Sequence, residues 1–396
     1  MVGTNIMDHP LTWAEIDLNA YAHNIKELRR ITQPDAMLMA VVKANGYGHG
    51  AAEVAREALQ NGAQWLGVAR INEAVDLRQA GLEAPILIMG YTPADLARRL
   101  IEFDLAQTVY SYSNAEILSG KALKLGKKIN VHIKMDSGMG RLGLVTNALL
   151  PQKAIRKANP NPLDIIEKIA KLRGLDIQGL FTHFATADSA DKSYANQQLE
   201  IFLDFLHQLR RAGLQPPMRH AANSAALIDV PESHLDMVRP GIATYGLYPS
   251  DEVNKDNAIL KPVMALKSSI IHLKKVSAGF NVSYGITYQT DKPTTIATVP
   301  VGYADGFNRL FSSRGRMMVH GQSVPIIGRV CMDLTMLDVG TIPDVEIEDE
   351  VLIFGRQGGV SITADEMASQ LNTINYEIVS TVMARVPRIY IQSDKK

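Results

Sequence analysis

The chain has 396 residues, of which 46% are hydrophobic and 21% are charged, a length that suits two domains or one large barrel with an appendage. Lys plus Arg and Asp plus Glu both total 41, so a zero net charge gives no electrostatic reason to expect nucleic acid or an anionic membrane as a partner. No apolar run approaches the roughly 18–20 residues of a membrane span, and no signal peptide is visible. Cys331 is the one cysteine, so an internal disulfide is excluded. These features predict a cytoplasmic protein of enzyme size.

The N-terminal part of the chain, from residue 36 to about residue 245, alternates short apolar runs with amphipathic stretches. Helices are predicted over Ala51–Asn61 and Asn72–Ala80, and over a third stretch that carries apolar residues from Leu199 to Leu209. Gln152–Pro162 is predicted to be a long surface connection. Eight strands are predicted, a number that favours a (β/α)8 TIM-type barrel over a doubly wound sheet: Ala36–Val42, Trp65–Val68, Ile86–Met89, Ala106–Tyr110, Ile129–Met135, Ile177–Thr182, Arg219–Ala222 and Asp236–Arg239.

After about residue 250 the pattern changes to short runs rich in β-formers, punctuated by Gly, Pro and Asp. We therefore predict a barrel domain over residues 1–250 and a mainly β domain over residues 251–396. Thr363–Gln370 and the segment around Tyr376 are not assigned. The strands predicted for the second domain are Thr294–Val301, Arg316–Val319, Val324–Ile327, Cys331–Val339 and Glu350–Phe354.

The strongest local motif is AVVKANGYGHG, residues 40–50, in which Lys43 follows the first predicted barrel strand. Active sites of barrels lie at the carboxyl ends of the strands, although a lysine at a strand end is more often a surface residue. The glycines do not have the GxGxxG spacing of a dinucleotide site. There is also no GxxxxGK[ST] phosphate loop and no HExxH motif, so no metal site is expected.

Four further segments place chemically active side chains at predicted strand ends. They are HIKMDSGMGRLG (132–143), GLFTHFATAD (179–188), HAANSAA (220–226) and MVRPGIATYG (237–246). Each has a structural explanation when taken alone. Together with Lys43 they predict a lysine, a histidine, two arginines and a Ser-Gly phosphate cradle on one rim of the barrel.

These motifs resemble those of the alanine racemases, and the resemblance covers nearly the whole chain, from TWAEIDLNAYAHN to RVPRIY. It includes the C-terminal segments SYGITY, VGYADGFNR, GRVCMD and TINYE. The resemblance implies an isomerase that interconverts L-alanine and D-alanine with pyridoxal 5'-phosphate (PLP), supplying D-alanine for peptidoglycan. It also implies a barrel followed by a C-terminal β domain.

The resemblance assigns the residues that hold PLP. Lys43 matches the lysine that binds PLP covalently, and Arg239 matches the arginine that faces the pyridine nitrogen. His220 is placed to support Arg239, and His183 matches a residue that contacts both PLP and Tyr284. The remaining contacts, most of them to the phosphate, are expected from Tyr47, Asn223, Ser224, Gly241, Ile242 and Tyr376.

The resemblance also assigns the residues that handle the substrate. Lys43 serves one face of the reacting carbon, and Tyr284 matches the family's base on the opposite face. Arg141 and the backbone near Met332 match the groups that bind the substrate carboxylate. Lys134 matches a lysine often found as a carbamate, which would orient Arg141. Because the family's tyrosine and methionine come from a second subunit, a homodimer with composite sites is implied.

Three other functions compete with this one. PLP decarboxylases for basic amino acids share the layout, but they carry an acidic residue and a cysteine where this chain has Arg239 and Tyr284. A non-catalytic, single-barrel PLP-binding protein would lack the C-terminal domain. A broad-specificity or serine racemase of the same fold stays open, because the sequence does not decide which small amino acid reacts.

Overall fold

The computed structural model describes residues 10–149, 161–357 and 359–392. Its contacts divide the chain into two compact units. One holds residues 21–46 and 51–261, and we call it the barrel unit; the other holds residues 1–20, 47–50 and 262–396, and we call it the β unit. Within the described ranges, no helix combines the length and apolar character needed to cross a membrane.

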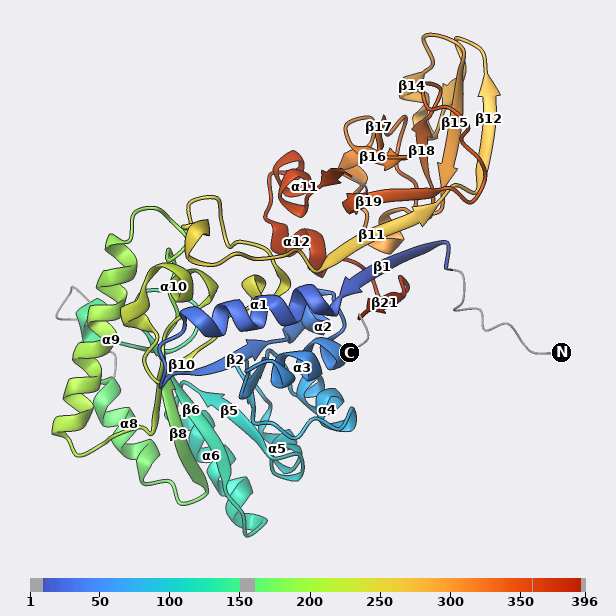
Figure 1. Ribbon diagram of the computed structural model, residues 1–396. Helices are drawn as coiled ribbons and strands as arrows, with labels where there is room; N and C mark the ends of the chain where they lie inside the picture. Colours follow the sequence, from blue (N-terminus) through green and yellow to red (C-terminus); the bar gives the residue numbers. More distant parts are fainter. Residues whose placement is uncertain (1–9, 150–160, 358, 393–396) are drawn as a thin grey trace. The chain divides into compact units, whose positions relative to one another are not determined.

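Eight parallel strands form the centre of the barrel unit in the part of the chain that is described (Figure 1), and a short ninth strand, β7 (Leu144–Val145), joins the same sheet. The first and last strands of the series meet through backbone hydrogen bonds from Asp236 N to Arg219 O and from Arg239 N to Ala222 O, each 3.0 Å long. The predicted barrel is thereby confirmed, and each predicted strand agrees with the observed one to within two residues. In sheet order the strands are β10 (Met237–Val238), β2 (Met37–Val41), β3 (Trp65–Val68), β4 (Ile86–Ile88), β5 (Leu105–Val109), β6 (Ile129–Asp136), β8 (Leu175–Phe181) and β9 (Met218–His220).

Amphipathic helices connect these strands and cover the outside of the sheet (Figure 1). The three predicted helices are confirmed as α3, α4 and α9; on α9 the residues Leu199, Phe202 and Leu209 are buried as expected. Residues 152–160 of the predicted connection lie outside the described ranges, and Asn161 caps α8 by accepting a hydrogen bond from Leu163 N. The helices are α1 (Leu18–Ile31), α3 (Ala51–Gln60), α4 (Ile71–Gln79), α5 (Ala97–Glu102), α6 (Tyr112–Lys124), α8 (Pro162–Ala170), α9 (Ser193–Arg211) and α10 (Ser224–Asp229).

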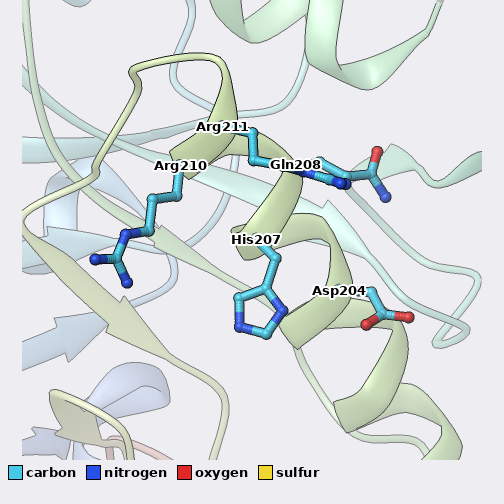
Figure 2. Close-up of a pocket in the computed structure, with 5 residues that line it drawn as sticks. All are labelled: Asp204, His207, Gln208, Arg210 and Arg211. Carbon is cyan, nitrogen blue, oxygen red and sulfur yellow. The ribbon is translucent and has the colours of Figure 1, made fainter.

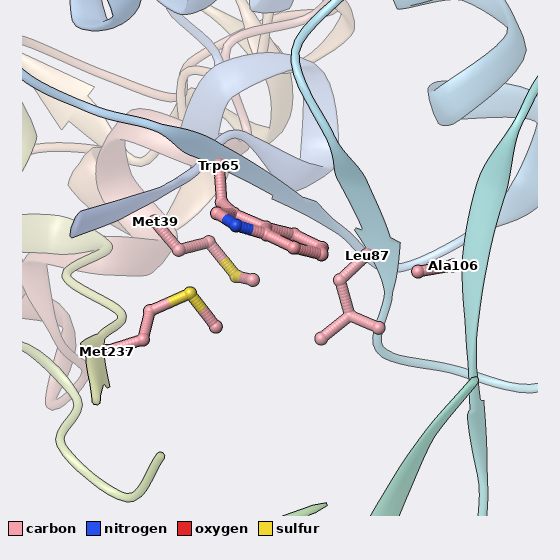
Figure 3. Close-up of a cluster of buried hydrophobic side chains, with 5 residues drawn as sticks. All are labelled: Met39, Trp65, Leu87, Ala106 and Met237. Atoms are coloured by element: carbon pink, nitrogen blue, oxygen red, sulfur yellow. The ribbon is translucent and has the colours of Figure 1, made fainter. Parts of the chain in front are cut away.

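The barrel interior is filled by side chains from facing strands, apolar in one layer and polar in the next. Figure 3 shows the apolar layer, in which Met39, Leu87, Ala106 and Met237 surround Trp65. In the polar layer, the ring of His132 on β6 meets the edge of Trp65, with 5.4 Å between the ring centroids. Barrel interiors are ordinarily filled by branched apolar residues. The polar layer lies toward the carboxyl ends of the strands, where barrel proteins build their active sites.

The β unit contains a mixed sheet whose main path runs β17-β16-β19-β11-β1-β21, in which neighbouring strands are antiparallel except for the parallel pair β1 and β21. A second sheet has the order β12-β15-β18, and Val282, Ile296, Ile327 and Met336 form a buried cluster in this unit. The elements are β1 (Thr12–Asp17), β11 (Met264–Ser269), β12 (His272–Val276), β13 (Asn281–Val282), β14 (Tyr288–Gln289), β15 (Thr294–Val299), β16 (Arg316–Val319), β17 (Gln322–Pro325), β18 (Thr335–Asp338), β19 (Glu350–Gln357), β20 (Val360–Ile362), α11 (Ala364–Leu371), α12 (Asn375–Ser380) and β21 (Arg388–Ile391).

Four of the five strands predicted for this unit differ from the observed strands in their bounds: Glu350–Phe354 extends to Gln357, Thr294–Val301 ends at Val299, and two others differ at their starts. The predicted strand Val324–Ile327 begins two residues earlier, because the tight turn at His320 and Gly321, both with positive φ, pairs Val319 directly with Gln322. The predicted strand Cys331–Val339 is reduced to β18. The carbonyls of Cys331 and Met332 accept hydrogen bonds from Tyr303 N and Ala304 N instead, which holds this segment in a turn.

Candidate active site

Lys43 lies in an unusual turn immediately after β2. The turn, α2 (Lys43–Tyr47), contains four consecutive residues with positive φ: Ala44, Asn45, Gly46 and Tyr47, at 53°, 53°, 62° and 51°. Left-handed conformations are costly for residues other than glycine, and such strain gathers at functional sites. The Glu73 carboxylate of α4 accepts a hydrogen bond from Ala44 N at 2.6 Å, and its other oxygen accepts from Ala69 N and Arg70 N. A single acid therefore holds the ends of two barrel strands together.

Four cationic side chains converge at the carboxyl ends of the barrel strands. Arg141 lowers the pKa of both Lys43 and Lys134, so its charge lies close to both amines. Burial is the largest cause in each case and brings the pKa of Lys134 to about 8. Burial also lowers the pKa of Arg239 to about 9, so this guanidinium keeps its charge at neutral pH. Asp136 partly offsets the excess of positive charge, which leaves a mouth suited to anions.

Arg239 is fixed by hydrogen bonds on several sides and is 4% exposed. Its Nη1 donates to His220 Nδ1 at 2.9 Å, and its Nη2 donates to Thr182 O, Ala221 O and His183 Nδ1 at 2.8, 3.0 and 3.3 Å. The guanidinium also lies 5.3 Å from the centre of the Phe181 ring. Burial and the Arg239 charge together hold the pKa of His183 and of His220 well below the usual range, so both rings are neutral.

Hydrogen-bond donors gather beside these cations at the starts of two short helices. Ser224 begins α10, and its Oγ accepts from Gly241 N at 2.8 Å and from Ala243 N at 3.3 Å. The hydroxyl proton of Ser224 thus stays available for a further acceptor. Ile242 begins the 3-10 helix η5 (Ile242–Tyr245), where backbone N–H groups have no partner within the helix. Asn223 caps α10 by accepting from Ala226 N at 3.0 Å.

The remaining predicted site residues belong to the β unit. The rings of Tyr47 and Tyr376 lie 6.2 Å apart, centre to centre, so these two tyrosines are neighbours within that unit. Tyr284 begins the 3-10 helix η7 (Tyr284–Ile286) and is 72% exposed. Met332, also exposed, lies in the turn held by the 3-10 helix η8 (Tyr303–Asp305). Tyr284 and Met332 thus present their side chains to solvent within their own unit.

Sequence reasoning missed two residues of this site. Glu73 was read only as part of a helix, because nothing local indicates that its carboxylate reaches Ala44, 29 residues earlier. His132 begins the motif that supplied Lys134 and Arg141, yet it received no role; its Nδ1 lies 2.9 Å from His220 Nε2. The available signal was the alternation of side chains along a strand, which places every second residue on the same face. His132 and Lys134 therefore share the inward face of β6.

A separate hollow of about 530 Å³ lies on the outer face of α9 (Figure 2). It is lined by Asp204, His207, Gln208, Arg210 and Arg211, which all belong to that one helix. None of the residues described above lines it. This hollow is thus separate from the cationic barrel mouth.

The barrel and its cationic mouth define the class of this protein: a (β/α)8-barrel protein whose positively charged strand ends suit anionic small molecules. Models of the alanine racemase N-terminal and C-terminal domains match residues 16–249 and 263–390. The chain belongs to the alanine racemase family.

Individual relatives agree with this membership over almost the full length. An alanine racemase of Desulfosudis oleivorans is 55% identical, with 96% of each chain covered. The solved alanine racemase of Clostridium difficile 630 superposes with a TM-score of 0.89 at 40% identity, covering 97% of this chain and 96% of that one. That of Bartonella henselae, solved with covalently bound pyridoxal phosphate, has a TM-score of 0.82 at 30% identity and covers 97% of this chain and 100% of its own.

Proposed function

We propose that this protein is an amino-acid racemase that interconverts L-alanine and D-alanine with PLP as its cofactor. The observation that carries the proposal is the convergence of Lys43, Lys134, Arg141 and Arg239 at one barrel mouth, beside the donors of Ser224. The names of the relatives that match the full chain support it.

The residues present fit PLP in three respects. Lys43 has a lowered pKa, which raises the share of neutral amine able to bind an aldehyde. The Ser224 hydroxyl and the Ile242 N–H suit a phosphate dianion. Arg239, which keeps its proton, suits an unprotonated pyridine nitrogen. When bound there, PLP supplies an electron sink that makes the Cα proton of an amino acid acidic enough to remove.

The proton transfers then fall to two side chains. Lys43 removes or returns the proton on one face of Cα, a role that its lowered pKa favours because a neutral amine is the base. We assign the opposite face to Tyr284, which is exposed in the β unit and is expected to serve the barrel of a partner subunit. His183, neutral and bonded to Arg239 through Nδ1, leaves its Nε2–H to orient a neighbouring acceptor.

Arg141 is assigned to the substrate carboxylate, with the backbone at Met332 of a second subunit as its complement. Lys134 is proposed to carry a carbamate, whose negative charge would turn its repulsion of Arg141 into attraction. This arrangement implies a homodimer. The cytoplasmic location of the enzyme and its role in supplying D-alanine for peptidoglycan stay predictions.

The test is interconversion of the alanine enantiomers by the purified protein, followed by circular dichroism, with serine and lysine compared on kcat/KM. We expect alanine to lead, because added side-chain atoms in a tight site typically cost about 1–3 kcal/mol, which is about 5- to 150-fold in rate. Lys43→Ala should abolish turnover, whereas Lys128→Ala, at the amino end of β6, should leave it unchanged. Equal rates for serine and alanine would point to a broad-specificity racemase, and no turnover of any of the three would refute the proposal.

A further inference from the structure

Three polar side chains, His132, His220 and Arg239, form a continuous hydrogen-bonded line inside the barrel. His132 Nδ1 lies 2.9 Å from His220 Nε2, and His220 Nδ1 lies 2.9 Å from Arg239 Nη1. His132 and His220 are fully buried, and Arg239 is 4% exposed. The line crosses the barrel interior from β6 through β9 to the residue that follows β10.

The chemistry of the three groups determines where each proton lies. A guanidinium has donors only, so the His220 Nδ1 that faces Arg239 must be an unprotonated acceptor. A neutral His220 therefore carries its proton on Nε2 and donates it to His132 Nδ1. A neutral His132 in turn carries its proton on Nε2. The charge of Arg239 thus sets the tautomers of two successive rings.

In the described part of the chain, the far end of the line has no group that opposes this direction. His132 Nε2 is buried without a hydrogen-bond partner among the described residues. Leaving a buried donor unpaired is unfavourable, so this tautomer persists only if the other end of the ring demands it. Packing fixes both rings in place: Phe181 stacks on His220 at 4.6 Å and 6°, and Trp65 meets His132 edge-on.

The charges that face the two rings also keep them neutral. Burial, and after it the charge of Arg239, lowers the pKa of His132 to about 3 and moves that of His220 in the same direction. A protonated ring would bring a second positive charge into the buried line beside Arg239. If His220 were protonated on Nδ1, that N–H would face the N–H donors of the Arg239 guanidinium.

We propose that His132 is a positioning residue for Arg239: it accepts the proton of His220 Nε2, so that His220 presents its Nδ1 lone pair to the guanidinium. The inference deepens the proposed function, because Arg239 is the group assigned to the pyridine nitrogen. His132 is thus not itself assigned a contact with substrate or cofactor. It acts through His220, two hydrogen bonds from Arg239.

The first test is ¹⁵N NMR of the unmodified protein labelled at its ten histidines. We expect both His132 and His220 to carry a proton on Nε2 and none on Nδ1, with the two signals identified by His132→Asn and by their mutual hydrogen bond. A proton on Nδ1 of either ring would overturn the inference. This result does not depend on turnover, so it is distinguishable from failure of the racemase proposal.

The second test compares two substitutions by the dissociation constant for PLP and by the absorbance of the bound cofactor. His132→Phe removes the acceptor and should weaken PLP binding about fivefold or more, with a displaced absorbance maximum. His132→Asn places an acceptor oxygen where Nδ1 lies and should restore binding to within about twofold.

His234→Phe is the matched control, because His234 is also fully buried in the barrel unit, yet it bonds to Leu227 O and Gln33 N and not to the line. It should change PLP binding less than about twofold even if it lowers stability. The inference fails if His132→Phe binds PLP as tightly as the unmodified protein does. It also fails if His132→Asn binds PLP as weakly as His132→Phe. Should His132→Phe not fold, His132→Asn and the NMR result decide.

Discussion

Lys134 is a lysine whose amine is held away from water and among other positive charges. It is 4% exposed on β6, lies 5.5 Å from the centre of the Phe181 ring, and has Arg141 and Arg239 as positive neighbours. With a pKa of about 8, about 10% of its amines are neutral at pH 7, against about 0.03% for an ordinary lysine. Only the neutral amine can combine with carbon dioxide, so the fold prepares Lys134 for a carbamate.

We therefore predict that ¹³C NMR in the presence of labelled bicarbonate detects a carbamate carbon that Lys134→Ala removes and Lys128→Ala keeps. At a fixed concentration of dissolved carbon dioxide the signal should grow as the pH rises from 6 to 8, because the amine loses its proton in that window. Lys134→Ala should raise KM for alanine about tenfold, with a smaller effect on kcat, through the lost orientation of Arg141. An unmodified lysine at pH 8 would contradict the assignment.

At the scale of elements, the turn that carries Lys43 depends on α4. Ala44 and Asn45 occupy left-handed conformations at an expense of about 1–2 kcal/mol each. Glu73 offsets this by accepting three backbone hydrogen bonds, from Ala44, Ala69 and Arg70. The helix thus acts as a clamp on the loops after β2 and β3, in addition to covering the sheet.

Glu73→Gln should lower the free energy of unfolding by about 1–3 kcal/mol, because the new amide turns donors toward backbone N–H groups. It should also lower the pKa of Lys43 further, since the carboxylate raises it in the native protein. Chemical denaturation and the pH dependence of lysine modification measure the two effects. Glu53→Gln, which breaks an exposed pair with Arg56, is the control and should change stability by less than about 0.5 kcal/mol. Equal effects of the two substitutions would refute the role of Glu73.

At the scale of the whole molecule, the proposed bases belong to different compact units: Lys43 to the barrel unit and Tyr284 to the β unit. If each active site combines the barrel of one subunit with Tyr284 of the other, two inactive variants should restore activity when they are mixed. We predict that Lys43→Ala and Tyr284→Phe, denatured together and refolded in equal amounts, recover about a quarter of the native activity. Half of the dimers are then mixed, and each mixed dimer has one intact site. Recovery of none would place both bases in one chain.

The sequence alone determined the barrel and the position of its chemistry. Strand periodicity is local, so β3 and β16 were predicted to the residue. Because the carboxyl ends of parallel strands share one face, Lys43, Lys134, His183 and Arg239 could be placed together before any contact was known. In the β unit the bounds were less certain: the strand predicted from Cys331 begins only at Thr335, because hydrogen bonds from Tyr303 N and Ala304 N hold Cys331 and Met332 in a turn.

Only the tertiary structure decided which polar groups meet. His132 and His220 are 88 residues apart in the chain, and Glu73 is 29 residues from Ala44, so no local pattern could pair them. The left-handed conformation after Lys43 could not be predicted either, because only one of Ala44, Asn45 and Gly46 is a glycine. The lowered pKa of Lys134 arises from burial and from the charges of Arg141, Arg239 and Lys43, two of which follow other strands. Periodicity indicates which face of a strand is inward, whereas the packing of strands distant in sequence sets the hydrogen bonds and electrostatics there.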